Sequence, residues 1–341
     1  MRINQFRVIP YSIPFVKPLR TAENIYSHRE GLWLNIKWED CSGWGEAAPL
    51  IGFSQESLKS IHYALEGFYH SIKGETFEKE EIISLVEIHF KENPSAQFAI
   101  ETAIYDLLAQ NANKSLSAYL NSSSKSEISV NGLTGIHLPG DDFTIMKVKV
   151  GFRNLFDEIE HMEKLTHSFG NDILFRLDAN GAFNLPQAIR FCKEMEVFNI
   201  DYIEQPLPAT ELLDLAELIY HTDIPIAVDE SLIDINSAEK IIEEQAAHVF
   251  IIKPMVSGGF TESKKIIQLA RQEDVRAVIT SSLETSIGRM ACLHLALANE
   301  ISEICGLATG ELLNDEIVLP SIKNGIMQVP NKPGLGIGLE V

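Results

Sequence analysis

The sequence predicts an α/β protein built around a (β/α)8-type, TIM-like barrel, with a smaller α+β domain before it. In residues 123–317, eight short apolar runs recur, from Ile128–Val130 as the expected first strand to Ile304–Leu307 as the expected eighth, separated by helical patterns. Polar residues end successive runs at intervals of 24 to 29 residues, for example 29 from Lys149 to Asp178 and 24 from Asp229 to Lys253. One strand–helix unit has about this length, and eight such units close a barrel.

The first domain shows a different pattern. Alternating apolar residues between positions 3 and 48 predict three strands in an antiparallel meander. Helical patterns follow at 55–72, 77–90 and 96–111, the last with alanines at helical spacing that permit close packing. We place the first domain at residues 1–122 and the barrel at 123–317. The polar segment 121–126 is the expected linker, and the Gly- and Pro-bearing tail, residues 318–341, is expected to return to the first domain.

Composition narrows the class of partner. The 341 residues include 28 basic and 48 acidic side chains, a formal charge of −20. So negative a surface argues against nucleic acid or an anionic membrane as partner, and an anionic substrate would need a local cationic site. No apolar run approaches the roughly 18 residues of a membrane helix. With no signal-peptide pattern and four cysteines outside any metal-ligand spacing, we expect a cytoplasmic protein with reduced, mostly buried thiols.

Three carboxylates end three neighbouring predicted strands: Asp178, Glu204 and Asp229. Left unpaired on one arc of a barrel they would repel each other, and a divalent cation would relieve that repulsion. An oxygen-only ligand set without His or Cys favours Mg²⁺ first and Mn²⁺ second. Asn180 and Glu230 are either supporting residues around this metal site or helix caps.

Lysines end two further strands of the predicted barrel. Lys149 and Lys253 follow strands 2 and 6, which lie opposite each other in a ring of eight, so the two lysines should flank a substrate bound at the metal. Lys147 points to the same side as Lys149. A second ammonium and a dication nearby would favour loss of the Lys149 proton, as a general base requires. This arrangement predicts removal of a proton next to a carboxylate, with the metal stabilising the ene-diolate.

Ordinary explanations exist for each residue alone. A lone acid at a strand end is usually a cap, and a lone lysine is usually a surface residue. Arg176 alternates with Asp178 onto the inner side, where it either anchors a substrate carboxylate or pairs with Glu204 or Asp229. A barrel that only binds an anion would need the metal and one lysine, so the two opposed lysines favour an enzyme.

The strand-end segments together resemble the muconate-lactonizing-enzyme subgroup of the enolase superfamily, over essentially the whole chain. They are Lys147-Val148-Lys149, Asp178-Ala179-Asn180, Glu204-Gln205-Pro206, Asp229-Glu230-Ser231 and Lys253-Pro254, together with residues 43–49. The resemblance implies that residues 1 to about 120 and the tail form a cap over the barrel. It also implies that Lys149 is the principal base and a small-molecule carboxylate the partner. Whether the chain forms a homo-oligomer stays open.

Three loops are similar to those of o-succinylbenzoate synthases: the first at residues 17–22 and 28–31, the others at 281–288 and 306–310. The similarity implies syn-dehydration of a cyclohexadiene carboxylate to o-succinylbenzoate in menaquinone synthesis. Lys149 would remove the proton and then protonate the departing hydroxide, while Lys253 stays charged. Arg20 and Arg29 would lie in a lid that closes over the substrate. The substrate contacts expected from these loops are Arg20, Arg29, Ser281, Ser282 and Glu284, and Arg176 is added from its inward position.

Other members of the subgroup remain alternatives. N-acylamino-acid racemases, which include N-succinylamino acid racemases, share these loop features. Dipeptide epimerases usually carry Asp-x-Asp after the eighth strand, where this chain has Gly306-Leu307-Ala308-Thr309-Gly310-Glu311. Muconate cycloisomerase is a third alternative.

Overall fold

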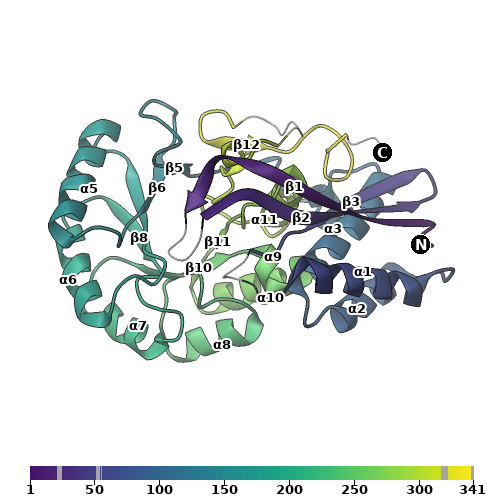
Figure 1. Cartoon of the computed structure of the whole chain (residues 1–341), viewed down its shortest axis with the longest axis horizontal. Helices are drawn as coiled ribbons and strands as arrows, with labels where there is room; N and C mark the ends of the chain where they lie inside the picture. Colours follow the sequence, from purple (N-terminus) through teal and green to yellow (C-terminus); the bar gives the residue numbers. More distant parts are fainter. Residues whose placement is uncertain (21–24, 51–53, 55, 316–321, 339–341) are drawn as a thin grey trace.

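Three antiparallel strands open the chain in the computed structural model, which describes residues 1–20, 25–50, 54, 56–315 and 322–338, with the backbone alone at 19 and 20. Their order in the sheet is β1-β2-β3, which confirms the expected meander. The long β1–β2 hairpin extends from the first domain across the barrel (Figure 1). The strands are β1 (Gln5–Arg20), β2 (Ile25–Trp38) and β3 (Cys41–Ala47).

Four helices follow this sheet, and the third is buried along most of its length. Ala99 and Ala103 face the sheet where β3 carries glycine. A Cβ on Gly45 would lie 1.9 Å from the Ala99 carbonyl oxygen, and one on Gly43 would lie 2.1 Å from the Ala103 oxygen. The expected close packing of this helix therefore depends on both partners being small. The helices are α1 (Leu58–Ile72), α2 (Lys79–His89), α3 (Pro94–Asn111) and α4 (Leu116–Leu120).

Seven parallel strands form a curled sheet in the order β5 to β11, wrapped on the outside by helices (Figure 1). This confirms the predicted barrel class. The strands are β5 (Gly132–Leu133), β6 (Ile145–Lys149), β7 (Leu174–Asp178), β8 (Ile200–Glu204), β9 (Ile226–Val228), β10 (Val249–Ile252) and β11 (Arg276–Ile279). The helices are α5 (Leu155–Phe169), α6 (Leu185–Met195), α7 (Leu212–Ile219), α8 (Ile235–Glu243), α9 (Pro254–Ser257), α10 (Gly259–Gln272) and α11 (Ser286–Ala298).

The ring closes less regularly than the sequence predicts. The expected eighth strand, residues 304–307, makes single bridges from Cys305 to Val130 and from Gly306 to Thr280. The expected first strand is divided, because β4 (Glu127–Ser129) pairs antiparallel with β12 (Ile326–Gln328) and only β5 joins the parallel sheet. The predicted helix between the first two barrel strands is wrong, since residues 134–144 connect β5 to β6 without one.

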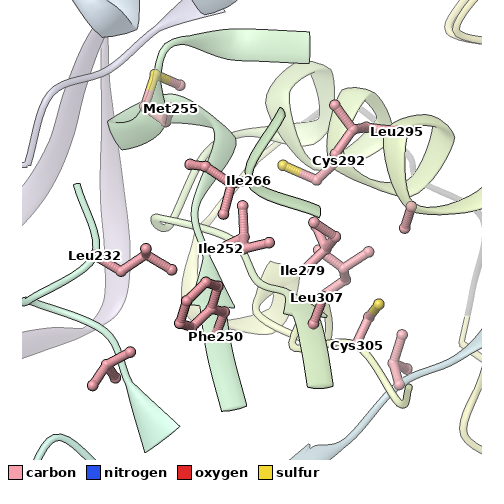
Figure 2. Close-up of a cluster of buried hydrophobic side chains, with 14 of the residues drawn as sticks. Leu232, Phe250, Ile252, Met255, Ile266, Ile279, Cys292, Leu295, Cys305 and Leu307 are labelled. Carbon is pink, nitrogen blue, oxygen red and sulfur yellow. The ribbon is translucent and has the colours of Figure 1, made fainter. Parts of the chain in front are cut away.

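Apolar side chains fill the space between the sheet and its outer helices. Figure 2 shows one part of this core, where Ile252 of β10 and Ile279 of β11 meet Ile266 of α10 and Leu295 of α11. Of the four free cysteines, three are buried and Cys41 is partly exposed. No helix in the described part of the chain is both long and apolar enough to cross a membrane.

The described part of the tail contacts both domains. Beside its strand pairing with β4, it places Gly334 against α4, where the Leu116 amide donates to the Gly334 carbonyl at 2.8 Å. The Leu335 amide donates to Asp106 of α3 at 2.8 Å, and the Leu335 carbonyl lies 3.3 Å from His294 of α11. The domain limits at 122 and 317 stay a prediction.

Candidate active site

Strand register brings the predicted acids together. Lys149, Asp178 and Glu204 are direct neighbours across β6, β7 and β8. Ala227 and Ile251 belong to a small cluster inside the barrel, and side chains alternate along a strand. Asp229 and Lys253, each two positions further on, therefore also point inward at the carboxyl ends of their strands.

Each lysine of the cluster contacts a carboxylate. The Lys147 ammonium lies between two acids, 2.8 Å from Asp178 Oδ2 and 2.7 Å from Glu204 Oε1. Lys149 Nζ donates to the same Asp178 oxygen at 2.7 Å. On the other side of the site, Lys253 Nζ donates to Asp229 Oδ2 at 2.5 Å. The structure thus brings together all of the predicted metal ligands and lysines, while their roles stay predictions.

The charges of the cluster shift its proton equilibria. Burial opposes an ionised Asp178, but two ammonium groups outweigh it and hold the pKa of Asp178 below its usual range. Burial and the Asp178 charge raise the pKa of Glu204. Burial alone would lower the pKa of Lys147 and of Lys253, yet the carboxylates that they contact outweigh it and raise both. The lysines therefore favour ionisation of the acids that they contact, while burial and like charge oppose ionisation of Glu204.

Asn180 and Glu230 connect the two sides of this cluster. Asn180 accepts a hydrogen bond from Lys149 and donates through Nδ2 to Glu230 Oε1 at 2.8 Å. Burial, followed by the Asp229 charge, raises the pKa of Glu230. Asn180 has φ of 43°, a left-handed backbone conformation that asparagine adopts more readily than most other residues. Both residues contact the predicted machinery and do not serve as helix caps.

The chemistry of the acids fits a hard divalent cation. Glu204 Oε2 is buried and has no hydrogen-bond partner, and an ammonium already sits between Asp178 and Glu204. Positive charge is therefore favoured here, and the oxygen donors match the preference of Mg²⁺. As the side chains stand, no group of three acids, histidines or cysteines among the described residues is arranged to hold an ion. The lysines occupy carboxylate oxygens that metal binding would need.

A cavity of about 370 Å³ opens beside these residues at the carboxyl ends of β7 to β10. Its polar side carries Asp229, Glu230 and Lys253. Its other side is largely apolar and comes from the loops that follow β8, β9 and β10. The cavity is lined by Asn180, Gly181, Gln205, Pro208, Ala209, Asp229, Glu230, Leu232, Ile233, Lys253 and Val256.

Gln205 is a site residue to which the sequence analysis gave no role. Its Oε1 accepts from the amides of Asp229 at 3.0 Å and Ser231 at 3.1 Å. Its Nε2 donates to Leu207 O at 2.9 Å and to Ser231 Oγ at 2.8 Å. Gln205 thereby fixes the strand end that carries Asp229. The sequence did offer a signal for this role, since Gln205 stands between the inward Glu204 and Pro206. A polar side chain buried at that position must find hydrogen-bond partners.

Arg176 does not reach the carboxyl ends of the strands. It is fully buried inside the barrel, where Nε donates to Asp201 at 2.8 Å and Nη1 donates to Ile304 O at 2.7 Å. Its guanidinium also stacks 4.8 Å from the Tyr202 ring centre. We therefore correct two expectations: Arg176 pairs with Asp201, not with Glu204 or Asp229, and it does not line the cavity at the carboxyl ends of the strands.

Arg29 also differs from the expected lid arginine. It is 3% exposed, and its five N–H groups all donate to backbone carbonyls of the described chain, which leaves none for a substrate. This corrects its assignment as a direct substrate contact. The side chain of Arg20 and residues 21–24 lie outside the described residues. The Arg29 acceptors are Leu283 O at 2.9 Å, Pro49 O at 3.1 Å, Ser282 O at 3.2 Å, Glu30 O at 3.3 Å and Ala48 O.

The expected substrate residues after β11 lie in a buried loop. Ser281 Oγ is 2.6 Å from Thr309 Oγ1, which joins the loops after the seventh and eighth strands. The Ser282 amide donates to Glu284 Oε2 at 2.7 Å. Ser282 Oγ and Glu284 Oε1 are buried without a partner. Burial, with the nearby Glu46 charge, raises the pKa of Glu284. Their contact with substrate stays a prediction.

Comparison with known proteins gives matches along the whole chain. Residues 137–340 match a family model described as enolase C-terminal domain-like, and residues 3–107 match the MenC N-terminal domain. The L-Ala-D/L-Glu epimerase of Bacillus subtilis (strain 168) is 26% identical, with 99% of this chain and 97% of that protein covered. The N-succinylamino acid racemase of Thermus thermophilus is 28% identical, with 100% and 96% covered.

Two further matches bear on the reaction and the metal. The o-succinylbenzoate synthase of Bacillus subtilis is 25% identical, with 99% of this chain and 94% of that protein covered. A solved dipeptide epimerase from Enterococcus faecalis, complexed with Mg and the dipeptide L-Leu-L-Tyr, is 26% identical with a TM-score of 0.90, and 99% of each chain is covered.

Proposed function

Because the chain belongs to the enolase superfamily, through an enolase C-terminal domain-like part at residues 137–340, we propose that it is a magnesium-dependent enzyme that removes a proton next to a carboxylate. Its reaction in this proposal is the loss of water from a cyclohexadiene carboxylate to give o-succinylbenzoate. Asp178, Glu204 and Asp229 would hold Mg²⁺. When bound, Mg²⁺ would supply the positive charge that stabilises a substrate carboxylate as it gains electron density.

Lys149 is the proposed base and acid of this dehydration. Its side chain is 56% exposed, against 14% for Lys253, so substrate can approach it more freely. The neutral amine of Lys149 takes the proton next to the carboxylate, and the C–H electron pair enters the ene-diolate. The C–O bond to the leaving hydroxyl then breaks. The Lys149 ammonium returns its proton to that oxygen, which leaves as water and restores the amine.

Lys253 serves as a fixed positive charge in this proposal. Asp229 and Glu230 raise its pKa, which favours the ammonium form. An ammonium on the face opposite Lys149 stabilises the ene-diolate without exchanging its own proton. Asn180, hydrogen-bonded to both Lys149 and Glu230, orients the base.

The segment after the eighth strand argues against a dipeptide substrate. Leu307 and Ala308 are buried apolar residues there, and the Thr309 hydroxyl is hydrogen-bonded to the Ser281 hydroxyl. Glu311, the one acid between positions 306 and 311, is 69% exposed and lies 4.0 Å from His137. This segment supplies no pair of carboxylates for a substrate ammonium, which favours a substrate without one over a dipeptide.

The second candidate is an N-succinylamino acid racemase. The match to the Thermus thermophilus racemase and the placement of a lysine on each side of the site support it. A turnover assay with the cyclohexadiene carboxylate and an N-succinylamino acid side by side separates the two. We expect kcat/KM for dehydration to exceed that for racemisation by at least tenfold. A larger kcat/KM for racemisation, or turnover of dipeptides alone, would overturn the synthase proposal.

A further inference from the structure

Arg29 is a buried cation of the first domain that reaches into the barrel. It lies on β2, and two of its five acceptors, Ser282 O and Leu283 O, belong to the loop after β11. No salt bridge to Arg29 is found within the described residues, so backbone carbonyls provide its close partners. A buried guanidinium that loses hydrogen-bond acceptors incurs a large desolvation cost. The loop and the first domain therefore hold each other in place.

The loop that Arg29 holds stands beside the proposed acid–base machinery. The Thr280 amide donates to Ile252 O at 3.0 Å, and Ile252 directly precedes Lys253. The loop begins one residue after Thr280 and so lies next to Lys253 at the mouth of the barrel. Ser282 Oγ, buried without a partner, offers an unused polar group in this loop.

The conformation of this loop needs support. Leu283 has φ of 63°, in the left-handed region that side-chain-bearing residues rarely adopt. Its carbonyl accepts the Arg29 Nε hydrogen bond at 2.9 Å. A separate contact anchors the following helix, where Glu46 accepts from the amides of Thr285 and Gly288, each at 2.9 Å. Arg29 thus supports the strained turn, and Glu46 supports the helix behind it.

We propose that Arg29 is a positioning residue through which the first domain fixes residues 282–284 in the shape that receives substrate beside Lys253. This inference rests on the proposed function, because it takes the site around Lys253 as the substrate site. Arg29 itself touches no substrate. It acts on substrate affinity through the backbone of Leu283.

Steady-state kinetics of Arg29→Lys test this role. An ammonium has three donors in place of five and cannot reproduce the guanidinium fork. We expect KM for the cyclohexadiene carboxylate to rise at least tenfold, with kcat changed less than threefold. Adding Leu283→Gly should return KM to within threefold of wild type, because glycine adopts positive φ without strain. Arg190→Lys, at an exposed position on α6, is the matched control and should change neither constant.

Amide hydrogen exchange gives a readout that needs no substrate. In Arg29→Lys, amides of residues 282–284 should exchange at least tenfold faster than in wild type, while those of β7 and β8 keep their rates. Unchanged exchange would overturn the proposal whatever the substrate. So would an unchanged KM in an active enzyme, or variants that fail to fold even with Leu283→Gly. If wild-type protein turns over neither the cyclohexadiene carboxylate nor an N-succinylamino acid, the proposed function is refuted instead. The hydrogen-exchange measurement still tests the role of Arg29 in that case.

Discussion

Two lysines of similar chemistry stand in different surroundings at the carboxyl ends of β6 and β10. Lys149 is the more exposed and shares Asp178 with Lys147, whereas Lys253 is mostly buried against Asp229. An accessible amine can exchange a proton with substrate, and a buried ammonium next to an acid keeps its charge. The residue environments thus support a division of labour between base and electrostatic stabiliser.

Substitution of the two lysines tests this division. Lys149→Ala should lose nearly all dehydration activity. The rate should fall at least by the factor of about 10² to 10⁴ that acid–base catalysis typically contributes. Lys253→Arg should keep measurable dehydration, because a positive charge remains although its geometry differs. Steady-state rates with the cyclohexadiene carboxylate measure the contrast. Equal and complete loss in both variants would favour a racemase, in which each lysine must carry a proton.

The sequence could predict that these side chains share one rim of the barrel, because they obey one local rule. Asp178, Glu204 and Lys253 each end a barrel strand, and strand spacing alone places them on the same rim. The two arginines do not follow such a rule. Arg176 meets Asp201 at a register shift between β7 and β8, and Arg29 meets carbonyls more than 250 residues away. Such partners depend on tertiary packing, which periodicity does not encode.

A buried histidine provides a pH test of the packing between α11 and the tail. The Ser117 amide donates to His294 Nδ1 at 3.1 Å, so the neutral ring carries its proton on Nε2, which faces Leu335 O. Burial lowers the pKa of His294 to about 4. The unfolded chain therefore binds this proton at higher pH than the native state does. Its contribution to stability is present above about pH 6.5 and is lost as pH falls toward 4.

His294→Gln should remove this pH dependence. Between pH 7.5 and 4, the unfolding free energy of wild type should fall by about 3 kcal/mol more than that of the variant. Denaturant unfolding of both proteins across this range measures the difference. Parallel pH profiles would show that His294 does not stay neutral when buried.

At the scale of elements, α3 packs against both domains. Its alanines face the glycines of β3, and its buried Glu101 accepts from the Thr261 amide of α10 at 3.0 Å. Gly45→Ala should therefore destabilise the protein by about 1–3 kcal/mol, the usual range for overpacking, because its Cβ would meet the Ala99 oxygen. Thermal or denaturant unfolding gives the value.

Gly67→Ala is the matched control for this substitution. Gly67 lies in α1, and the nearest atom to an added Cβ is His89 Nε2 at 4.0 Å. Alanine there should be neutral or stabilising by up to about 1 kcal/mol, through its better helix propensity. Equal effects of the two substitutions would contradict the proposed close contact between α3 and β3.

The elements that the sequence predicted poorly are those with weak local signals. Residues 304–307 have the apolar character of a strand, but they pair through single bridges on each side. The Ile128–Val130 run is apolar too, yet part of it pairs with β12 from the tail. Apolar runs predict burial in both cases. Which neighbour they pair with is decided by how the ring closes.

At the scale of the whole molecule, the charge at the mouth of the barrel differs from that of the chain as a whole. The chain carries a formal charge of −20, while three ammonium groups gather at one rim of the barrel. The β1–β2 hairpin extends over this part of the molecule (Figure 1). These ammonium groups stand among carboxylates, so bound Mg²⁺ would add the positive charge that a small anionic substrate needs here.

Exchange of the substrate α-hydrogen with D₂O, followed by NMR on an N-succinylamino acid, most directly tests the claim that this rim removes a proton next to a carboxylate. It does not require that this compound be the preferred substrate. We expect exchange by wild-type protein with Mg²⁺, and loss of exchange after chelation with EDTA, in Glu204→Gln and in Lys149→Ala. Exchange that persists in all three cases, or that is absent from active wild-type enzyme, would contradict this account.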